Sequence, residues 1–384
     1  MRVAHVVHHY GRLSESFIPD ALAQLERAGA EAWVGTMSVE HRDTYAFPAD
    51  ERLLVCPPAP RWQRATDRLR GRSGAARFAD ALARRLGPLE PAVVHAQFGW
   101  AAESGVALAR RLGVRCAVTL HGTDVTTVPV RRPDARGWRG PPGHPYGRAL
   151  LDVDLAVAVS TFIADKVRAL GFAGPLEIVP AGVDLERLTF RPDEPPGTPR
   201  LLYLGRLNPQ KGPDLLLRAL PSVLERHPQA VLEVLGGGPS AAELERLAGA
   251  LGVADRVRFL GPLPGRAPVV AALRRAHVLV MPSRAMPDGQ AEGSPVVTKE
   301  AQAVGVALVA TDTGGIAETI PPAQRAQLAA GDDPAALAAR VSALLDDPEA
   351  RRRRAEEARR WVEEQFDQRR LAERTVALYA RLSE

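Results

Sequence analysis

The chain has little cysteine, few aromatic residues and no long apolar run. Its two cysteines, Cys56 and Cys116, stand in no CxxC or Cys/His spacing, so the sequence indicates neither a disulfide framework nor a zinc site. No apolar run reaches the roughly eighteen residues of a membrane-spanning helix. The apolar stretch in MRVAHVVHHY is too short for a signal peptide and predicts a first strand. We therefore expect a cytoplasmic protein.

Lysine is also scarce. The 50 basic residues are nearly all arginines, and the net charge is +5. The lysines are Lys166, Lys211 and Lys299. A general arginine bias without interleaved aromatic residues is no sign of nucleic-acid binding, so we expect no nucleic-acid partner.

Residues 61–86 form a basic, partly amphipathic segment. One interpretation is an acceptor-binding helix or a peripheral contact with the inner face of the membrane. The other is the solvated face of an ordinary helix. We favour the second slightly, because Gly71 and Gly74 interrupt the helical period.

Short apolar runs alternate with helical periods along the chain, which is typical of strands buried on both faces of a parallel sheet. The expected strands are 2–8, 32–36, 92–96, 115–120, 155–159 and 177–179, then 201–204, 230–235, 257–260, 278–281 and 307–310. The Pro-rich stretch 191–200 separates the two sets and reads as a linker. The pattern predicts an α/β protein with two Rossmann-like domains facing a cleft, where ligands bind at the carboxyl ends of the strands. The expected parts are a domain over 1–190, the linker 191–200, a domain over 201–365 and a C-terminal helix over 366–384 that packs back on the first domain.

The segment AEGSPVVTKEA carries the strongest chemical signal, because it follows the expected strand 278–281. Ser294 is a good N-cap and Pro295 a good first helical residue, so a helix is predicted to start here. Its first turn would leave the N–H groups of Val296 and Val297 free to bind an anion such as a diphosphate.

Two carboxylates flank this helix start. Glu292 precedes the helix and can accept hydrogen bonds from sugar hydroxyls, while Gly293 lets a ligand approach the backbone. Glu300 lies in the second turn, where it could hold a diol such as a ribose. The alternative is a capped surface helix with two solvated glutamates.

Arg206 and Lys211 follow the first strand of the second half. Two cations there would stabilise the charge that grows on a leaving diphosphate more than the charge of the ground state. The alternative, ordinary surface charge, fits Lys211 poorly because lysine is so rare in this chain.

Two further motifs are weaker. Gly237 belongs to a Gly-Gly-Gly-Pro turn after a strand, which is not a GxGxxG motif, and a tight turn explains it nearly as well as a ligand does. Asp152 and Asp154 look like a metal-binding DxD pair, but they precede the strand 155–159 and so lie at the wrong end of it. We therefore expect no metal.

These segments together resemble the family-4 retaining glycosyltransferases of the GT-B fold. The glutamate pair around EGSPVVTKEA looks like the family signature, and LHGTD, VPAGVDLERL, LYLGRLNPQKG and TDTGGIAETI resemble other family segments in the family's order. SESFI, HAQFGW and DGQAEGSPVV resemble a subgroup associated with exopolysaccharides of the colanic-acid type.

The resemblance implies a metal-independent hexosyltransferase without a cofactor. Its donor would be a nucleotide sugar, with a UDP-sugar favoured over a GDP-sugar. Its acceptor would be a glycan, a lipid-linked sugar or a small metabolite, as in polysaccharide biosynthesis.

The resemblance also implies roles for residues of this chain. It assigns His121 to the donor sugar near its anomeric carbon, Arg206 and Lys211 to the diphosphate, and Gly237 and Leu263 to the nucleotide. On the acceptor side it points to a loop with Gly11 and Ser14, where this chain departs from the usual Gly-Gly. Asp124 also belongs to that side, although an aspartate at this place can simply cap the next turn.

Two other functions remain as alternatives. An NAD(P)-dependent oxidoreductase is disfavoured because no GxGxxG follows the first strand. A non-catalytic sensor of nucleotide sugars is disfavoured because His121, Arg206, Lys211 and both glutamates are all present.

Overall fold

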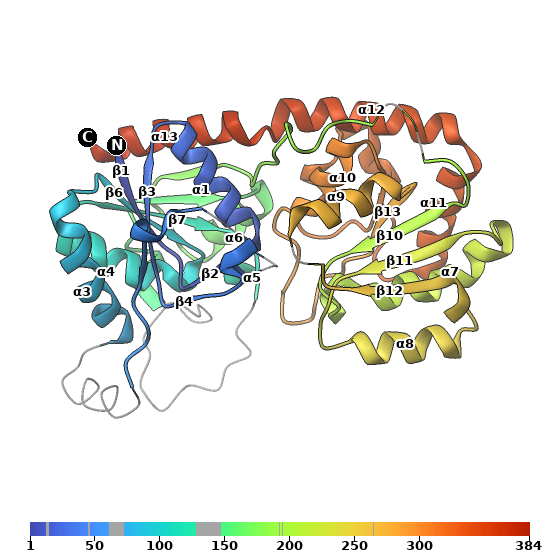
Figure 1. Ribbon diagram of the computed structural model, residues 1–384, viewed down its shortest axis with the longest axis horizontal. Coiled ribbons are helices and arrows are strands. Elements are labelled where there is room, and N and C mark those ends of the chain that lie inside the picture. The colour runs from blue at the N-terminus through green and yellow to red at the C-terminus, as the bar shows by residue number, and fades with distance from the viewer. Residues whose placement is uncertain are drawn as a thin grey trace. The chain divides into compact units, whose positions relative to one another are not determined.

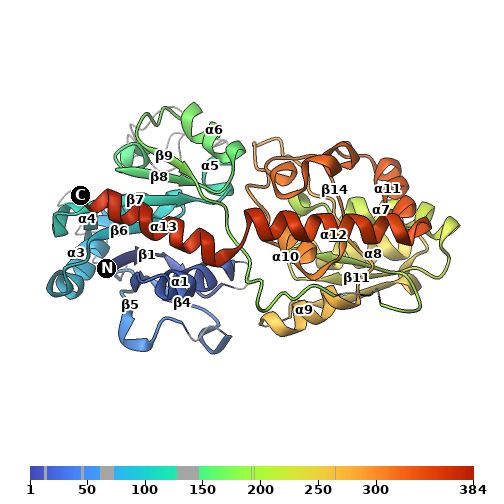
Figure 2. The ribbon, with the colours of Figure 1, turned by 90° about the horizontal axis from the view of Figure 1, so that it is seen from above.

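The computed structural model describes residues 1–12, 15–44, 47–60, 73–127, 147–191, 193, 195–263 and 265–384. The chain divides into two compact units (Figures 1 and 2): unit 1 is Met1–Ala181 with Gln368–Glu384, and unit 2 is Gly182–Asp367. Each unit has a parallel sheet with helices on both faces. The predicted α/β class with two Rossmann-like domains is confirmed.

The sheet of unit 1 has seven parallel strands in the part of the chain that the structure describes. In sheet order they are β5 (Leu53–Val55), β3 (Glu31–Thr36), β1 (Arg2–Val6), β6 (Val93–Gln97), β7 (Arg115–Leu120), β8 (Leu155–Ala158) and β9 (Leu176–Ile178). The first expected strand, 2–8, is shorter than predicted, since His9–Tyr10 forms a separate strand β2 that pairs with β4 (Ser38–Val39). The order reverses between β1 and β6, which makes their carboxyl ends the switch point of this sheet.

Helices cover both faces of this sheet. Their bounds are α1 (Phe17–Arg27), α3 (Gly74–Leu86), α4 (Ala102–Leu112), α5 (Thr123–Thr126), α6 (Thr161–Ala169) and α13 (Gln368–Ser383). Alternation along the strands explains the two layers: Ala4 and Val6 of β1 share a core with α3, α4 and α6, whereas Val3 packs with α1 and α13. Figure 2 shows α13 lying along α1 over the sheet.

A buried polar cluster joins α13 to the sheet. The ring of His95 in β6 forms a hydrogen bond with the hydroxyl of Tyr379 in α13, and its Nε2 lies 2.7 Å from Thr119 Oγ1. The ring of His5 lies beside both, with its centroid 5.5 Å from that of His95. Burial lowers the pKa of His95 to about 4, so this histidine is neutral at pH 7.

The sheet of unit 2 has five parallel strands in the described residues. In sheet order they are β12 (Val257–Gly261), β11 (Val231–Leu235), β10 (Arg200–Leu204), β13 (Val278–Met281) and β14 (Ala307–Ala310). Its helices are α7 (Pro213–Arg226), α8 (Ala241–Ala250), α9 (Arg266–Arg275), α10 (Val296–Val304), α11 (Pro334–Asp346) and α12 (Pro348–Gln365). Helices α7, α8 and α11 share one core with the sheet, and α9, α10 and α12 share the other.

The unit boundaries fall beside the predicted linker rather than on it. Unit 2 begins at Gly182, and Arg191, expected as the first linker residue, is buried within this unit. Its side chain donates hydrogen bonds to the carbonyl oxygens of Gly305 and Arg274. The stretch before the Pro-rich segment is therefore part of the second compact unit.

The segment 61–86 is described only from residue 73 onward, as α3 with Ser73 at its N-cap. Helix α3 buries Phe78, Leu82 and Leu86 in the core of unit 1. The predicted helix therefore uses its apolar face inside the unit. Among the described residues, no helix combines the length and the apolar character that crossing a membrane requires.

Candidate active site

The loops after β10 and β13 meet at the switch point of the unit 2 sheet. Lys211 ends a short 3-10 turn (Pro209–Lys211) after β10, and Ser283 and Glu292 follow β13. The side chain of Asn208 caps the turn by accepting a hydrogen bond from the N–H of Lys211 at 3.0 Å. The sequence thus brings a lysine and a carboxylate 81 residues apart to one point of the sheet edge.

Lys211 and Glu292 form a bidentate ion pair. Nζ of Lys211 lies 2.7 Å and 2.9 Å from the two carboxylate oxygens of Glu292, and Ser283 donates to the first of them at 2.7 Å. The Glu292 side chain is 6% exposed, while that of Lys211 is 25% exposed. An ammonium has three N–H donors, so one remains to meet a ligand oxygen from the solvent side.

Arg206 lies on the same loop and is exposed. The hydroxyl of Tyr203 donates to its carbonyl oxygen at 2.7 Å, which fixes the backbone there, and burial raises the pKa of that hydroxyl. Within the described residues the guanidinium of Arg206 makes no hydrogen bond or ion pair. Arg206 can therefore turn to an anionic ligand without breaking a contact.

The helix start after Glu292 differs from the prediction. Helix α10 begins at Val296, and Pro295, with extended backbone dihedrals, occupies the N-cap position. Ser294 is therefore not the N-cap; its hydroxyl instead accepts a hydrogen bond from Nζ of Lys299 at 3.0 Å. Val296 and Val297 remain in the first turn, so their N–H groups have no partner within the helix.

The segment after β14 supports the Glu292 loop. The N–H of Gly315 donates to the carbonyl oxygen of Glu292 at 2.8 Å, and a Cβ at Gly314 would lie 2.2 Å from that oxygen. Gly314 has a φ of +57°, so both its backbone conformation and the close approach require glycine. The Thr298 hydroxyl also joins α10 to Thr319 at 2.9 Å.

Glu300 pairs with Arg266, which the sequence analysis did not single out. Nη1 of Arg266, at the start of α9, donates to Oε1 of Glu300 in α10. The Glu300 side chain is 8% exposed. The carboxylate predicted to hold a ribose is thus held by an arginine in the first turn of the helix that follows β12.

The Gly-Gly-Gly turn lies between the loops after β10 and β12. The N–H of Leu207 donates to the carbonyl oxygen of Gly237 at 2.9 Å, and a Cβ at Gly237 would lie 3.4 Å from Pro262. Leu263 is partly buried beside the core that contains α9 and α10. These contacts show that the turn packs tightly.

In unit 1, His121 lies directly after β7, near the switch point. Its Nε2 is 2.9 Å from Oε1 of Gln97, and its ring lies against Phe17 and Phe98, with centroids 4.9 Å and 4.5 Å away. Phe98 has a φ of +70°, which is strained for an aromatic residue. Gln97 and Phe98 were not predicted as site residues, although both lie in the HAQFGW segment.

Asp124 connects the loop after β6 and the loop after β7 through buried hydrogen bonds. Its fully buried carboxylate accepts hydrogen bonds from the N–H groups of Gly99, His121 and Gly122, at 2.7–3.2 Å. Burial raises the pKa of this carboxyl group, while the backbone hydrogen bonds oppose that shift. Asp124 therefore holds the loop after β6 against the loop after β7.

The remaining acceptor-side positions are only partly described. Ser14 lies outside the described residues. Gly11 has a φ of +86°, and a Cβ there would lie 2.0 Å from the carbonyl oxygen of Glu40, so packing alone requires this glycine. His8 contacts Ser104 Oγ at 3.0 Å, and burial, more than the neighbouring His9, lowers its pKa to about 4.

The Asp152–Asp154 pair has structural contacts. Asp154 accepts a hydrogen bond from the N–H of Cys116 at 2.8 Å and pairs with Arg115, at the amino end of β7. Over the described ranges, no group of three or more His, Cys, Asp or Glu side chains is placed to hold a metal ion. Metal independence stays a prediction.

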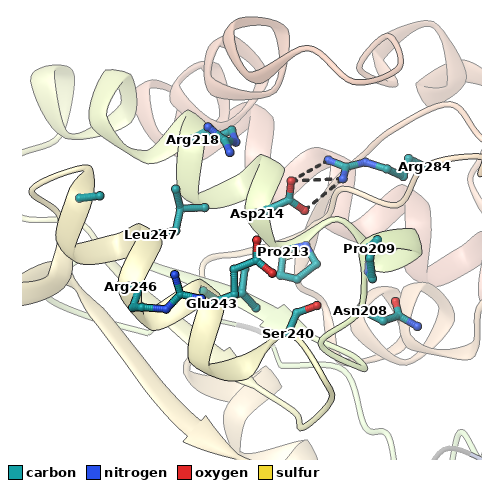
Figure 3. A pocket seen from close by; sticks show the side chains of 12 residues that line it. Asn208, Pro209, Pro213, Asp214, Arg218, Ser240, Glu243, Arg246, Leu247 and Arg284 are labelled. Carbon is teal, nitrogen blue, oxygen red and sulfur yellow. Dashed lines mark hydrogen bonds and ion pairs between the residues drawn. The ribbon is translucent and has the colours of Figure 1, made fainter.

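A cavity of about 410 Å³ lies between α7 and α8 (Figure 3). It shares Asn208 and Pro209 with the Lys211 loop, and two of its lining residues, Arg284 and Asp214, pair with contacts of 3.1–3.2 Å. None of the candidate site residues lines it. The cavity is therefore a neighbour of the switch-point site and separate from it.

Comparisons with known proteins identify the family of the chain. Residues 15–187 match the family model described as Glycosyltransferase Family 4, and residues 185–361 match the model described as Glycosyl transferases group 1. A glycogen synthase of Mycobacterium tuberculosis is 32% identical over 297 residues, which are 75% of this chain and 68% of that relative. The chain belongs to the family-4 glycosyltransferases of the GT-B fold.

Another relative matches part of the chain in sequence, and two solved structures match nearly all of it in fold. A GDP-mannose-dependent α-(1-6)-phosphatidylinositol monomannoside mannosyltransferase of Mycolicibacterium smegmatis is 36% identical over 255 residues, 63% of this chain and 64% of the relative. The match thus spans less than two thirds of that enzyme. The structure of Anabaena Alr3699/HepE with UDP and glucose has a TM-score of 0.76 at 16% identity, covering 100% of both chains. A sucrose-phosphate synthase of Thermosynechococcus elongatus has a TM-score of 0.76 at 20% identity, covering 99% of this chain and 98% of its own. At these identities the two structures support the fold.

Proposed function

We propose that this chain transfers a hexose-type sugar from a nucleotide sugar to an acceptor hydroxyl, with retention of the anomeric configuration and without a metal. The ion pair of Lys211 and Glu292, beside the first turn of α10 at the switch point, carries this proposal. The pair and the helix start together provide a cation, a buried carboxylate and backbone N–H donors, which are the groups that a sugar diphosphate requires.

The leaving diphosphate interacts with Arg206, Lys211 and the N–H groups of Val296 and Val297. The bond between the sugar and the diphosphate breaks with its electron pair on the diphosphate, so negative charge grows on these oxygens. Cations and helix dipoles that are already in place stabilise that charge without reorganisation. Arg206 supplies a second cation, since its guanidinium is exposed.

The sugar is oriented by Glu292. Its first oxygen accepts from Ser283 and Lys211, while its second accepts from Lys211 and has a further lone pair for a sugar hydroxyl. The family resemblance assigns His121 to the donor sugar, and within unit 1 its position is set by Gln97 and Asp124. The acceptor oxygen bonds to the anomeric carbon on the face that the diphosphate leaves, and the hydroxyl proton passes to the leaving diphosphate oxygen. No covalent sugar–enzyme intermediate is part of the proposal.

Retention is tested on the product itself. With an acceptor, or in slow hydrolysis without one, proton NMR identifies the first anomer formed before mutarotation. We expect the anomer of the donor, and an inverted first product would overturn the retaining mechanism.

The identity of the donor is open to a direct screen. One relative is named for GDP-mannose, and the HepE structure contains UDP. Our preference for a UDP-sugar rests on the sequence resemblance. Thermal shifts with UDP, GDP and ADP and with their hexose conjugates rank the bases, because a ligand at 100 times its Kd stabilises the folded chain by about 2.7 kcal/mol. A preference for GDP would correct the base and leave the transfer reaction in place, whereas stabilisation by none of them would refute the proposal.

Peripheral membrane contact through 61–86 is a separate proposal. Arg84 and Arg85 in the last turn of α3 are exposed, while the apolar face of the helix is buried. Binding would then be electrostatic and sensitive to salt. Sedimentation with vesicles containing an anionic lipid tests this; equal binding to neutral vesicles would contradict it.

A further inference from the structure

Arg266 is placed where an arginine is unfavourable for its own helix. It is the first residue of α9, whose first turn contains no acidic residue, and the preceding Gly265 provides no side-chain cap. The amino end of a helix carries a partial positive charge, so a cation there costs stability. The other arginines in this helix, Arg274 and Arg275, lie in the last turn, where the helix dipole favours them. The position of Arg266 therefore needs a compensating interaction.

Glu300 provides that interaction. Helices α9 and α10 pack together in one core, to which α9 contributes Leu273 and α10 contributes Ala301. Arg266 reaches from the end of α9 to Oε1 of Glu300, across 34 residues of sequence. A carboxylate that is 8% exposed needs a partner to remain charged, and the guanidinium is that partner.

The pairing leaves half of the carboxylate available. Within the described residues, the second oxygen of Glu300 accepts no hydrogen bond. It is not fully buried, so solvent or a ligand can reach it. One oxygen is thus held and the other can accept from a ligand. A ribose diol needs an acceptor in a fixed orientation, which a carboxylate held at one oxygen supplies.

We propose that Arg266 is a positioning residue: it holds the carboxylate of Glu300 in the orientation that receives the ribose hydroxyls of the donor. This inference rests on the proposed function, since it takes Glu300 as the ribose acceptor. It makes the affinity for the nucleotide depend on an arginine of a different element, the first residue of α9, which follows β12.

The test compares ribose with dideoxyribose. Calorimetry gives the Kd of the preferred nucleoside diphosphate and of its 2′,3′-dideoxy analogue for wild type, Arg266→Gln, Arg266→Lys and Glu300→Gln. We expect Arg266→Gln to weaken binding of the ribonucleotide about tenfold or more, to leave the dideoxy analogue within about twofold, and to be partly restored in Arg266→Lys. The double variant Arg266→Gln/Glu300→Gln should bind little worse than Glu300→Gln, because both changes remove one interaction.

The matched control is Arg258→Gln on β12, where the arginine is exposed and makes no hydrogen bond or ion pair with the described residues. It should bind both ligands as wild type does.

In turnover assays, Arg266→Gln should raise the KM of the donor with kcat nearly unchanged, because ribose contacts are equal in the ground and transition states.

Three results would overturn the inference. They are unchanged ribonucleotide binding in Arg266→Gln, equal losses for the ribonucleotide and the dideoxy analogue, and additive effects in the double variant. If Arg266→Gln fails to fold, Arg266→Lys decides: it must show the same selective loss in milder form. A wild-type protein that binds no nucleoside diphosphate refutes the proposed function itself and removes the basis of this inference.

Discussion

Lys299 offers the sharpest test of how unit 2 is assembled. Its side chain is fully buried in α10, with Nζ 3.0 Å from Ser294 Oγ and 5.0 Å from the ring centroid of Phe366. Burial lowers its pKa from 10.5 to about 7. Replacing it by methionine keeps an unbranched side chain, one heavy atom shorter, and removes the titrating group.

The sign and size of the effect follow from linkage. The folded chain binds this proton more weakly than the unfolded chain, so Lys299 lowers the free energy of unfolding at pH 7 and ceases to do so near pH 10.5. With pKa values of about 7 and 10.5, the difference between the two conditions is about 4 kcal/mol, at about 1.4 kcal/mol per pH unit. For a unit of this size, 1 kcal/mol corresponds to roughly 2–4 °C, so the unfolding temperature should shift by roughly 8–16 °C.

The assay is calorimetric unfolding of the whole chain from pH 7 to 10.5, with the unit 2 transition identified by its shift with nucleotide. Between pH 7 and pH 10.5, the free energy of unfolding of unit 2 should rise by about 4 kcal/mol more in wild type than in Lys299→Met. The control is Lys166→Met, since Nζ of Lys166 also lies over an aromatic ring, 5.4 Å from the centroid of Phe162, but the side chain is exposed. Parallel pH profiles for wild type and Lys299→Met would refute the reasoning.

Three further predictions concern activity and stability. Lys211→Ala should reduce turnover about 100-fold or more, because the leaving diphosphate loses a cation, with unchanged circular dichroism; near-normal kcat removes Lys211 from that role. Asp124→Asn should lower the free energy of unfolding of unit 1 by about 1–3 kcal/mol in urea titrations, since the amide NH₂ faces backbone donors, and no change would contradict its structural role. His95 has a pKa of about 4 in the folded chain against 6.5 in the unfolded chain, so its contribution to the free energy of unfolding is complete above pH 6.5 and falls by about 3 kcal/mol as the pH drops toward 4. In a His95→Gln variant the free energy of unfolding should depend less steeply on pH over this range. Identical pH profiles of stability for wild type and variant would refute this.

Much of the fold could be predicted because the central strands are continuous apolar runs bounded by turn residues. The strands Arg115–Leu120, Val278–Met281 and Ala307–Ala310 have the predicted bounds. Helix Ala102–Leu112 ends before Gly113, which has a φ of +71°. The three-residue edge strand Leu53–Val55 was missed, because so short a run has no period of its own.

The candidate site was predictable where its residues lie in one motif and not where they meet through the fold. Glu292 and Lys211 were selected singly, from local sequence, yet their ion pair depends on the order of strands β10 and β13. Arg266 gave no local signal, since it is one arginine among many and its partner is 34 residues away. Ser294 was assigned as an N-cap because its type favours that position, but the buried Lys299 engages its hydroxyl instead.

The central claim is that Lys211, paired with Glu292, acts on the diphosphate of a nucleotide sugar. The most direct measurement is release of nucleoside diphosphate from the donor that stabilises the chain most, by wild type, Lys211→Ala and Lys166→Ala. The account predicts release by wild type and by Lys166→Ala, and a loss of about 100-fold or more in Lys211→Ala. Equal release by all three proteins, or binding of the nucleotide sugar without any release, would contradict it.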